Sequence, residues 1–137
     1  MTGRGRTAPA GTGLADSSVF IATEQAGPTR EAPPPSEIAV SVVTVGELRL
    51  GVLAAADGQT RARRLETLSR AEGLEPLPVD RPVAHAWAAL RLALRDSGKR
   101  MPLNDSWIAA TAIAHRLPVV SQDDDYDGVP GVRVIHI

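Results

Sequence analysis

The sequence predicts an α/β protein, a three-layer α/β/α sandwich with a mainly parallel central sheet. Two observations support this expectation. Short β-branched runs, at residues 38–42 and 118–121, have the length of strands. Longer segments between them, such as the one from Val83 to Leu94, carry apolar residues at helical spacing. Strands separated by helices are typical of parallel sheets, because the chain must cross over between neighbours that run in the same direction.

Local signals place the elements of the first half. Residues 14–16 form a short strand that passes directly into a helix, which ends near Gly27–Pro28. The segment 29–36 contains three consecutive prolines and can form neither a regular helix nor a central strand. The next strand, at 38–42, leads into a helix that opens at residues 44–47.

The second half of the chain is mainly helical. Residues 60–72 are amphipathic, and we expect Leu65 and Leu68 to face inward. Residues 82–97 form a long helix that stops at Gly98, a residue suited to the left-handed conformation at a helix end. The remaining expected elements are an edge strand at 74–79, limited by Pro76 and Pro78, a helix at 105–115, and strands near 118–121 and 132–136.

Composition bounds the class of protein. The chain has 137 residues, the size of one domain, and a 43% hydrophobic content that can build a core. It has no cysteine, which excludes disulfides and cysteine-ligated zinc and favours a reducing, cytoplasmic setting. No apolar run approaches the roughly 20 residues of a membrane-spanning helix. The formal net charge of −1 argues neither for nor against a nucleic-acid substrate.

Four carboxylates occupy positions that this fold brings to one edge of the sheet. Asp16 ends the first strand, and Asp123 follows the strand at 118–121 by two residues. Glu47 and Asp105 lie in the first turns of helices, and ligands bind beyond the carboxyl ends of such strands. Like charges about 4 Å apart repel by about 4 kcal/mol at an effective dielectric near 20. Converging carboxylates therefore favour a hard cation, Mg²⁺ or Mn²⁺, and a phosphodiester substrate.

Each acid also has a purely structural explanation. Asp16 can cap a helix, and Glu47 completes a capping-box pattern. Asp105 is favoured by the helix dipole whether or not it binds a metal. We expect Asp124 and Asp127, in the same acidic run as Asp123, to be solvated surface residues.

The four segments around these acids resemble the signature segments of the PIN domain family. They read LADSSVFIA, SVVTVGELRLGVLAA, PLNDSWIAATAIAH and VVSQDDDYDGVPGVRVI. Their order and spacing match as well, from Leu14 to the C-terminus, and the likeness is greatest to the VapC-type members, the ribonuclease toxins of bacterial toxin–antitoxin pairs. The resemblance implies a PIN domain over 14–137. Residues 1–13 carry arginines and small residues but no apolar segment, and we expect them to form a flexible tail.

For function, the resemblance implies a Mg²⁺- or Mn²⁺-dependent endoribonuclease whose acids activate water for RNA cleavage. It also implies a small antitoxin partner of the VapB type and a homodimer. Hydrogen bonds from Ser17, Ser121 and Asn104 are expected to support the site. By position, the catalytic and metal-binding acids are Asp16, Glu47, Asp105 and Asp123, with Asp125 as an auxiliary metal ligand.

Candidate RNA contacts lie close to the acids or on a basic helix face. Arg91 and Arg95 are one helical turn apart and are expected to hold phosphates or, equally, an acidic segment of a partner. Trp107, two residues after Asp105, either stacks on a base or packs in the core. Trp87 falls on the apolar stripe of its helix and is expected in the core.

Other functions stay open at this point. One is a non-catalytic PIN-fold module that binds RNA or protein, and another is a DNA-directed nuclease. An aspartyl-phosphate phosphohydrolase is disfavoured, because it needs a second Asp two residues after the nucleophile and Ser18 stands there. The three histidines, His85, His115 and His136, are not spaced as a metal-binding set.

Overall fold

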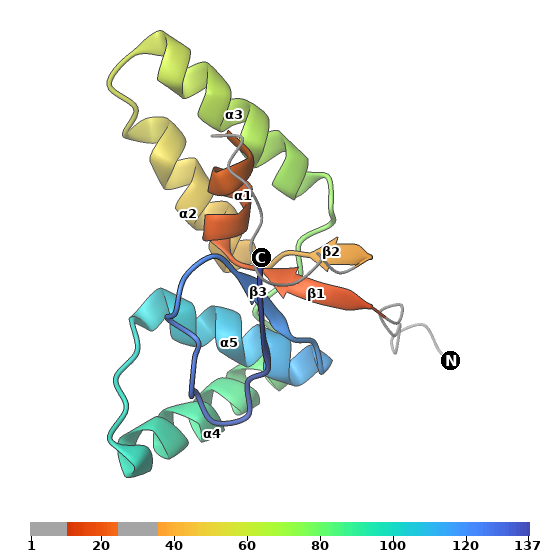
Figure 1. The fold of residues 1–137 in the computed structure, drawn as a ribbon, viewed down its shortest axis with the longest axis vertical. Coiled ribbons are helices and arrows are strands. Elements are labelled where there is room, and N and C mark those ends of the chain that lie inside the picture. Colours follow the sequence, from red (N-terminus) through yellow and green to blue (C-terminus); the bar gives the residue numbers. More distant parts are fainter. Residues whose placement is uncertain (1–10, 25–35) are drawn as a thin grey trace.

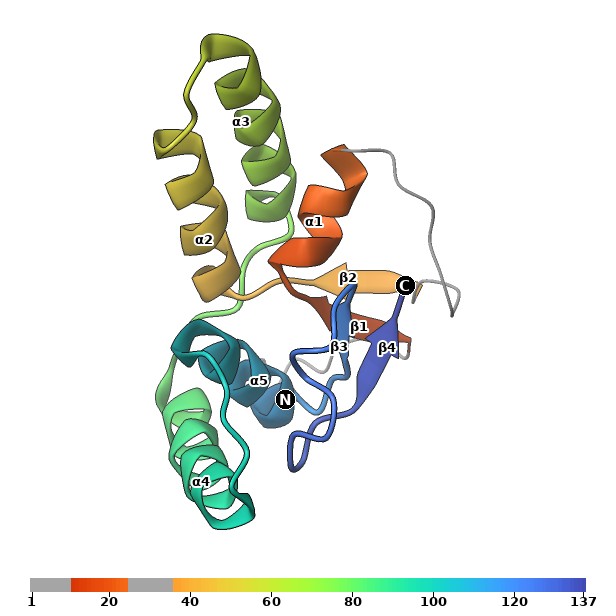
Figure 2. The ribbon, with the colours of Figure 1, turned by 60° about the vertical axis from the view of Figure 1, so that its left-hand side comes forward.

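A four-stranded parallel sheet forms the centre of the molecule, between two groups of helices (Figures 1 and 2). The computed structural model describes residues 11–24 and 36–137. The strands stand in the order β2-β1-β3-β4, and all neighbours are parallel. Their bounds are β1 (Thr12–Ala15), β2 (Glu37–Ala39), β3 (Val119–Ser121) and β4 (Val134–His136). The predicted fold class, an α/β sandwich with a parallel sheet, is confirmed.

The register of the two central strands creates a core on each face of the sheet. Leu14 pairs with Val119, and Ala15 pairs with Val120. Successive side chains of a strand point to opposite faces. Leu14 and Val119 accordingly belong to one buried cluster, while Ala15 and Val120 belong to the other. Each face of the sheet is therefore covered by an apolar core at these two strand pairs.

Five helices cover the two faces. The first cluster includes residues of α4 (Arg81–Ser97) and α5 (Leu103–His115), and the second includes residues of α1 (Ser17–Glu24), α2 (Val42–Leu53) and α3 (Gly58–Glu72). Helices α2 and α3 pack along one another and extend away from the sheet, as both views show. Gly98 ends α4 in the left-handed conformation at φ 74°, as predicted. In the part of the chain that the structure describes, no helix is long and apolar enough to cross a membrane.

Two predicted boundaries in the α2 region are wrong. Helix α2 begins at Val42 rather than Thr44, because Ser41 is its N-cap and its Oγ accepts the amide of Val43 at 3.0 Å. Glu47 consequently lies too far into the helix to complete a capping box. The strand expected at 74–79 is reduced to a single bridge between Leu77 and Ser41, since the flanking prolines cannot extend the ladder.

Other differences are smaller. Leu68 is buried as expected, but Leu65, which was also expected inward, is 42% exposed. The reason is that α3 covers the core only along its Thr67, Leu68 and Ala71 side. Strand β1 begins at Thr12, so the final residues of the expected tail belong to the sheet. Residues 1–10 of that tail, the predicted helix end at 27–28 and most of the proline-rich segment lie outside the described residues.

Candidate active site

The carboxyl ends of β1 and β3 lie side by side and bring Asp16 against the end of the neighbouring strand. The Asp16 amide donates to the Val120 carbonyl at 3.1 Å, which continues the ladder for one residue beyond β1. The Asp16 side chain is only 5% exposed, and its Oδ2 accepts a hydrogen bond from Ser121 Oγ at 2.8 Å. The structure thus contains a hydrogen bond from Ser121 to Asp16, the kind of contact that was expected of this residue.

Ser18, rather than Ser17, supports the other oxygen of Asp16. Both the amide of Ser18, at 3.1 Å, and its hydroxyl donate to Asp16 Oδ1. The hydroxyl of Ser18 also accepts the amide of Gln122 at 2.9 Å, which ties the start of α1 to the end of β3. Ser17 makes no side-chain hydrogen bond to a described residue, and the supporting role expected for it stays a prediction. The i to i+2 geometry of an Asp before a helix selects the second residue and not the first.

Ser121 links a second acid to the same site. Its Oγ lies 3.1 Å from Asp123 Oδ1 and accepts the Asp123 amide at 3.1 Å. The amide of Asp125 donates to Asp123 Oδ1 at 3.1 Å, so the loop after β3 folds around this carboxylate. A hydroxyl has one proton. Ser121 therefore shares that proton between Asp16 and Asp123 and holds the two acids next to one another.

Asp105 enters the site from the first turn of α5. Its Oδ1 accepts a hydrogen bond from Tyr126 Oη at 3.4 Å, and the Tyr126 side chain is fully buried. Burial, followed by the nearby carboxylates, raises the pKa of Tyr126 above its usual range, so the phenol stays protonated as a donor. Sequence reasoning missed Tyr126. The only local signal was that it is the single tyrosine of the chain and lies within the acidic loop.

Glu47 faces the start of α5 from the neighbouring helix α2. Asn104 Nδ2 lies 3.4 Å from Glu47 Oε2, a weak hydrogen bond that agrees with the supporting role predicted for Asn104. The other oxygen, Oε1, is buried and has no hydrogen-bond partner among the described residues. A buried carboxylate oxygen without a donor is costly. This oxygen is a free acceptor that a cation would satisfy.

The electrostatics of the site show that the predicted acids act on one another. Burial raises the pKa of Asp105 to about 7, and repulsion from the neighbouring carboxylates adds to this effect. Burial likewise raises the pKa of Asp16, although hydrogen bonds from Ser18 and Ser121 oppose the shift. The carboxylates that raise the pKa of Asp105 are Asp125, Glu47, Asp16 and Asp123, which with Asp105 make up the predicted set.

The acids surround the site without closing into a tight ligand shell. Among the described residues, the group whose candidate ligand atoms all lie within 4.8 Å of one another is a different one, Asp124, Asp127 and His136. His136 Nε2 lies 2.9 Å from Asp127 Oδ1. Asp124 and Asp127 are exposed, as expected. The spacing of the histidines along the sequence did not reveal this group, because β4 brings His136 beside the acidic loop only in the folded chain.

The two tryptophans, one on α4 and one on α5, stack on each other. Their ring centroids are 4.3 Å apart and their planes differ by 4°. Trp87 Nε1 also donates to Ser106 Oγ at 3.0 Å, and Trp87 is half-buried rather than enclosed in the core as predicted. Arg91 Cζ lies 5.7 Å from the Trp87 ring centroid. Arg91 and Arg95 line a pocket of about 260 Å³ together with Lys99 and Arg100, so the predicted basic face exists.

Comparison with known proteins identifies relatives over nearly the whole chain. The PIN domain family model matches residues 14–132. Ribonuclease VapC5 of Mycobacterium tuberculosis is 49% identical over 134 residues, which cover 96% of this chain and 98% of the relative. Ribonuclease VapC4 of the same organism is 52% identical over 126 residues, 90% of this chain and 95% of the relative.

A solved structure has the same fold. It is described as a member of the VapBC family of toxin–antitoxin systems, VapBC-5, from Mycobacterium tuberculosis. Its matched chain is 46% identical to this one, with a TM-score of 0.83, and the alignment covers 93% of this chain and 99% of that chain.

Proposed function

The chain belongs to the PIN domain family, and from this premise we propose that it is a metal-dependent endoribonuclease, the toxin of a toxin–antitoxin pair. The observation that carries the proposal is the convergence of Asp16, Glu47, Asp105 and Asp123 at the carboxyl edge of the sheet. Support for RNA as the substrate comes from relatives named as ribonucleases.

The donor set fits a hard divalent cation. All of its members offer carboxylate oxygens, which suit Mg²⁺ or Mn²⁺. The unpartnered Oε1 of Glu47 and the raised pKa of Asp105 both reflect negative charge without compensation. Asp16, Glu47, Asp105 and Asp123 would hold such an ion, with Asp125 as an auxiliary ligand. A bound ion would supply Lewis acidity to water and to a phosphoryl oxygen.

Neighbouring residues hold the catalytic acids in fixed positions. Hydrogen bonds from Ser18 and Ser121 keep both oxygens of Asp16 in place, and the loop amides around Asp123 do the same for that acid. Such preorganisation avoids rearranging the site during the reaction. In the proposed cleavage, water attacks phosphorus and the bond to the 3′-oxygen breaks. The products are a 5′-phosphate and a 3′-hydroxyl.

We also propose a small antitoxin as a protein partner and a homodimer as the assembly. The solved relative described as a VapBC member supports the antitoxin. The surface of the α2–α3 pair offers apolar area for a protein partner, since Leu50 and Leu53 are each 66% exposed. Co-expression with the product of a neighbouring small gene tests this point. A soluble complex that no longer cleaves RNA is expected.

Cleavage of a labelled single-stranded RNA tests the enzymatic proposal. The wild-type protein should cleave the RNA in the presence of Mg²⁺ or Mn²⁺. Its activity should be lost in EDTA and should return when the metal is restored. Asp16→Asn should lose at least about 100-fold in rate, as when a preorganised electrostatic group is removed. Asp124→Asn, an exposed neighbour with the same charge change, is the matched control and should stay active.

Three outcomes would contradict the proposal. Equal cleavage by wild type and Asp16→Asn would assign the activity to another site or to a contaminant. Faster cleavage of a DNA of the same sequence would indicate a DNA-directed nuclease. Absence of both cleavage and calorimetric Mg²⁺ or Mn²⁺ binding would indicate a non-catalytic binding module.

A further inference from the structure

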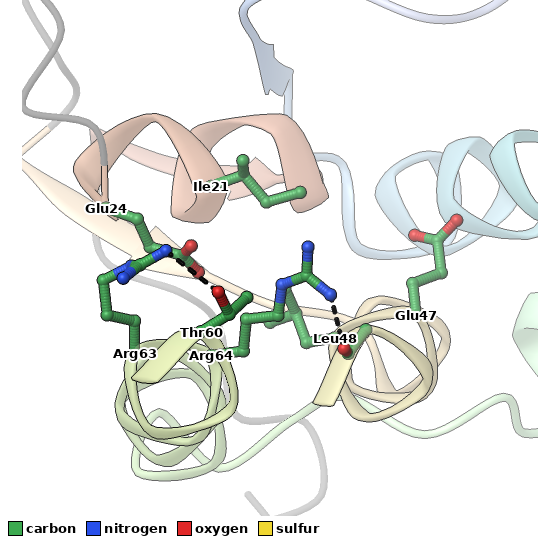
Figure 3. A pocket seen from close by; sticks show the side chains of 8 residues that line it. Ile21, Glu24, Glu47, Leu48, Thr60, Arg63 and Arg64 are labelled. Atoms are coloured by element: carbon green, nitrogen blue, oxygen red, sulfur yellow. Dashed lines mark hydrogen bonds between the residues drawn. The ribbon is translucent and has the colours of Figure 1, made fainter. Parts of the chain in front are cut away.

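A pocket of about 530 Å³ lies between α1, α2 and α3, directly beside the acidic site. Glu47 belongs to both the pocket and the acidic site, because its side chain lines the pocket at the end nearer α5 (Figure 3). The volume is in the range of small-molecule sites and suits one nucleotide. A polymer that places one phosphate at the acids can therefore place a neighbouring unit here.

Arg64 is the cation best placed to bind in this pocket. Its Nη1 donates to the Gly51 carbonyl at 2.7 Å, which holds the guanidinium against α2. In Figure 3 the group lies between α1 and α2, on the side of the pocket toward Glu47. Arg64 forms no ion pair with an acid in the described parts of the chain. A guanidinium has five N–H donors, so donors remain for a ligand.

The rest of the lining limits where a phosphate can bind. Arg63 and Glu24 also line the pocket, at the end away from Glu47 in Figure 3, so that end carries one charge of each sign. Ile21 and Leu48 supply apolar surface to the lining of the pocket. A ligand with one anionic group near Arg64 and a flat, partly apolar body matches this arrangement.

Building on the proposed function, we infer that the pocket binds the nucleotide adjacent to the scissile phosphate of the RNA, with Arg64 on its phosphate. The planar fork of arginine matches phosphate oxygens in a bidentate manner. The shared residue Glu47 makes the pocket continuous with the acids, as a single strand that crosses the site requires. An acidic segment of a protein partner is the competing occupant.

A matched pair of variants tests this inference. Arg64→Gln removes the pocket cation, whereas Arg61→Gln is the control outside the pocket lining. Both residues lie on α3, both changes remove one positive charge, and Arg61 also donates to a backbone carbonyl, that of Ala55, at 3.0 Å. The two variants therefore lose similar structural contacts, and they differ in whether the substituted residue lines the pocket.

The measurement is the salt dependence of binding of a fluorescent single-stranded RNA, by anisotropy, in EDTA so that metal-dependent cleavage does not occur. Loss of one phosphate contact lowers the slope of log K against log salt by about 0.7 for a single strand. Arg64→Gln should show this drop and bind about 10- to 100-fold more weakly at low salt, consistent with the loss of one charged hydrogen bond. Arg61→Gln should retain the wild-type slope.

A second variant covers the case in which Arg64→Gln fails to fold. Gly51→Glu adds a carboxylate beside Arg64 without removing it, and a Cβ at Gly51 would lie 3.8 Å from Arg64 Cδ, an ordinary contact. The same reduction in RNA affinity is expected.

Equal slopes for Arg64→Gln and Arg61→Gln would overturn the inference, as would a loss of antitoxin binding by Arg64→Gln with RNA binding intact. Cleavage by wild type with Mg²⁺ or Mn²⁺ separates the two proposals. If wild type cleaves but the slope does not depend on Arg64, the pocket assignment alone fails.

Discussion

The hydroxyl of Ser121 donates to Oδ2 of Asp16 at 2.8 Å, although the two residues are 105 positions apart in the chain. The contact exists because β1 and β3 are hydrogen-bonded neighbours whose carboxyl ends meet. The same hydroxyl lies 3.1 Å from Asp123 Oδ1. One side chain therefore couples the acid after β1 to the acid after β3.

Ser121→Ala should slow cleavage by about 10- to 100-fold, because a hydrogen bond to a charged group contributes about 1.5–3 kcal/mol. The Ser121 hydroxyl opposes the burial that raises the pKa of Asp16. Its loss raises that pKa further, so the acidic limb of the pH–rate profile should move to higher pH. Ser17→Ala is the control, and an equal effect of both variants would contradict the assignment.

Asp105→Asn should flatten the pH dependence of stability in metal-free buffer. The unfolded chain releases this proton near pH 3.8 and the folded chain near 7. Between these values the folded state holds more protons, so wild-type stability falls as pH rises. After discounting for solvent screening, the variant should exceed wild type by roughly 1–2 kcal/mol above pH 7 and match it below pH 4.

Urea unfolding of both proteins from pH 4 to 8 in EDTA measures this difference. Asp124→Asn serves as the comparison, since Asp124 is exposed. A wild-type stability that does not decline between pH 4 and 7 relative to Asp105→Asn would show that the Asp105 carboxyl is not perturbed.

Tyr126→Phe should retain the fold and lower cleavage by several-fold. The hydroxyl is the only part removed, and its contact with Asp105 Oδ1 is long at 3.4 Å, so a loss of about 1 kcal/mol is expected. Thermal unfolding and cleavage rates are the measurements. Full activity in a stably folded variant would show that Tyr126 serves packing and not the position of Asp105.

RNA binding should change the intrinsic tryptophan fluorescence. The chain contains two tryptophans, and both belong to one stack, to which Trp107 contributes from α5, the helix that also carries Asp105. If a base stacks on Trp107, the Trp87→Phe variant leaves that ring as the sole reporter, and RNA should quench it. Trp107→Ala should weaken RNA binding by about 5-fold or more, because base–aromatic stacking contributes about 1–3 kcal/mol.

The opposite pattern would assign Trp107 to packing. In that case RNA leaves the fluorescence unchanged, and Trp107→Ala lowers the free energy of unfolding without changing the affinity for RNA. A separate variant, Arg95→Gln, removes one positive charge from the exposed face of α4, where Arg95 pairs with Asp96 at 3.4 Å. Loss of this charge should reduce RNA binding uniformly across sequences.

Sequence patterns predicted the positions of the four main acids because those positions follow from element type alone. An acid directly after a parallel strand, such as Asp16, must lie at the carboxyl edge, whatever the rest of the fold does. Local patterns could not distinguish Ser17 from Ser18, because that choice depends on a two-residue hydrogen-bond geometry and on the amide of Gln122 across the sheet. Tyr126 was missed because its partner, Asp105, lies on another element.

The sequence by itself determined the α/β class, the parallel direction of the strands and the edge at which the carboxylates gather. Hydrophobic periodicity and the alternation of strands with helices are properties of the sequence itself. They can be recognised without knowing which elements contact one another. Only the tertiary structure decided the strand order, the exposure of Leu65 and the contacts of Ser121 and Glu47. Those features depend on how two apolar cores pack against opposite faces of one sheet, which couples residues that are distant in the chain.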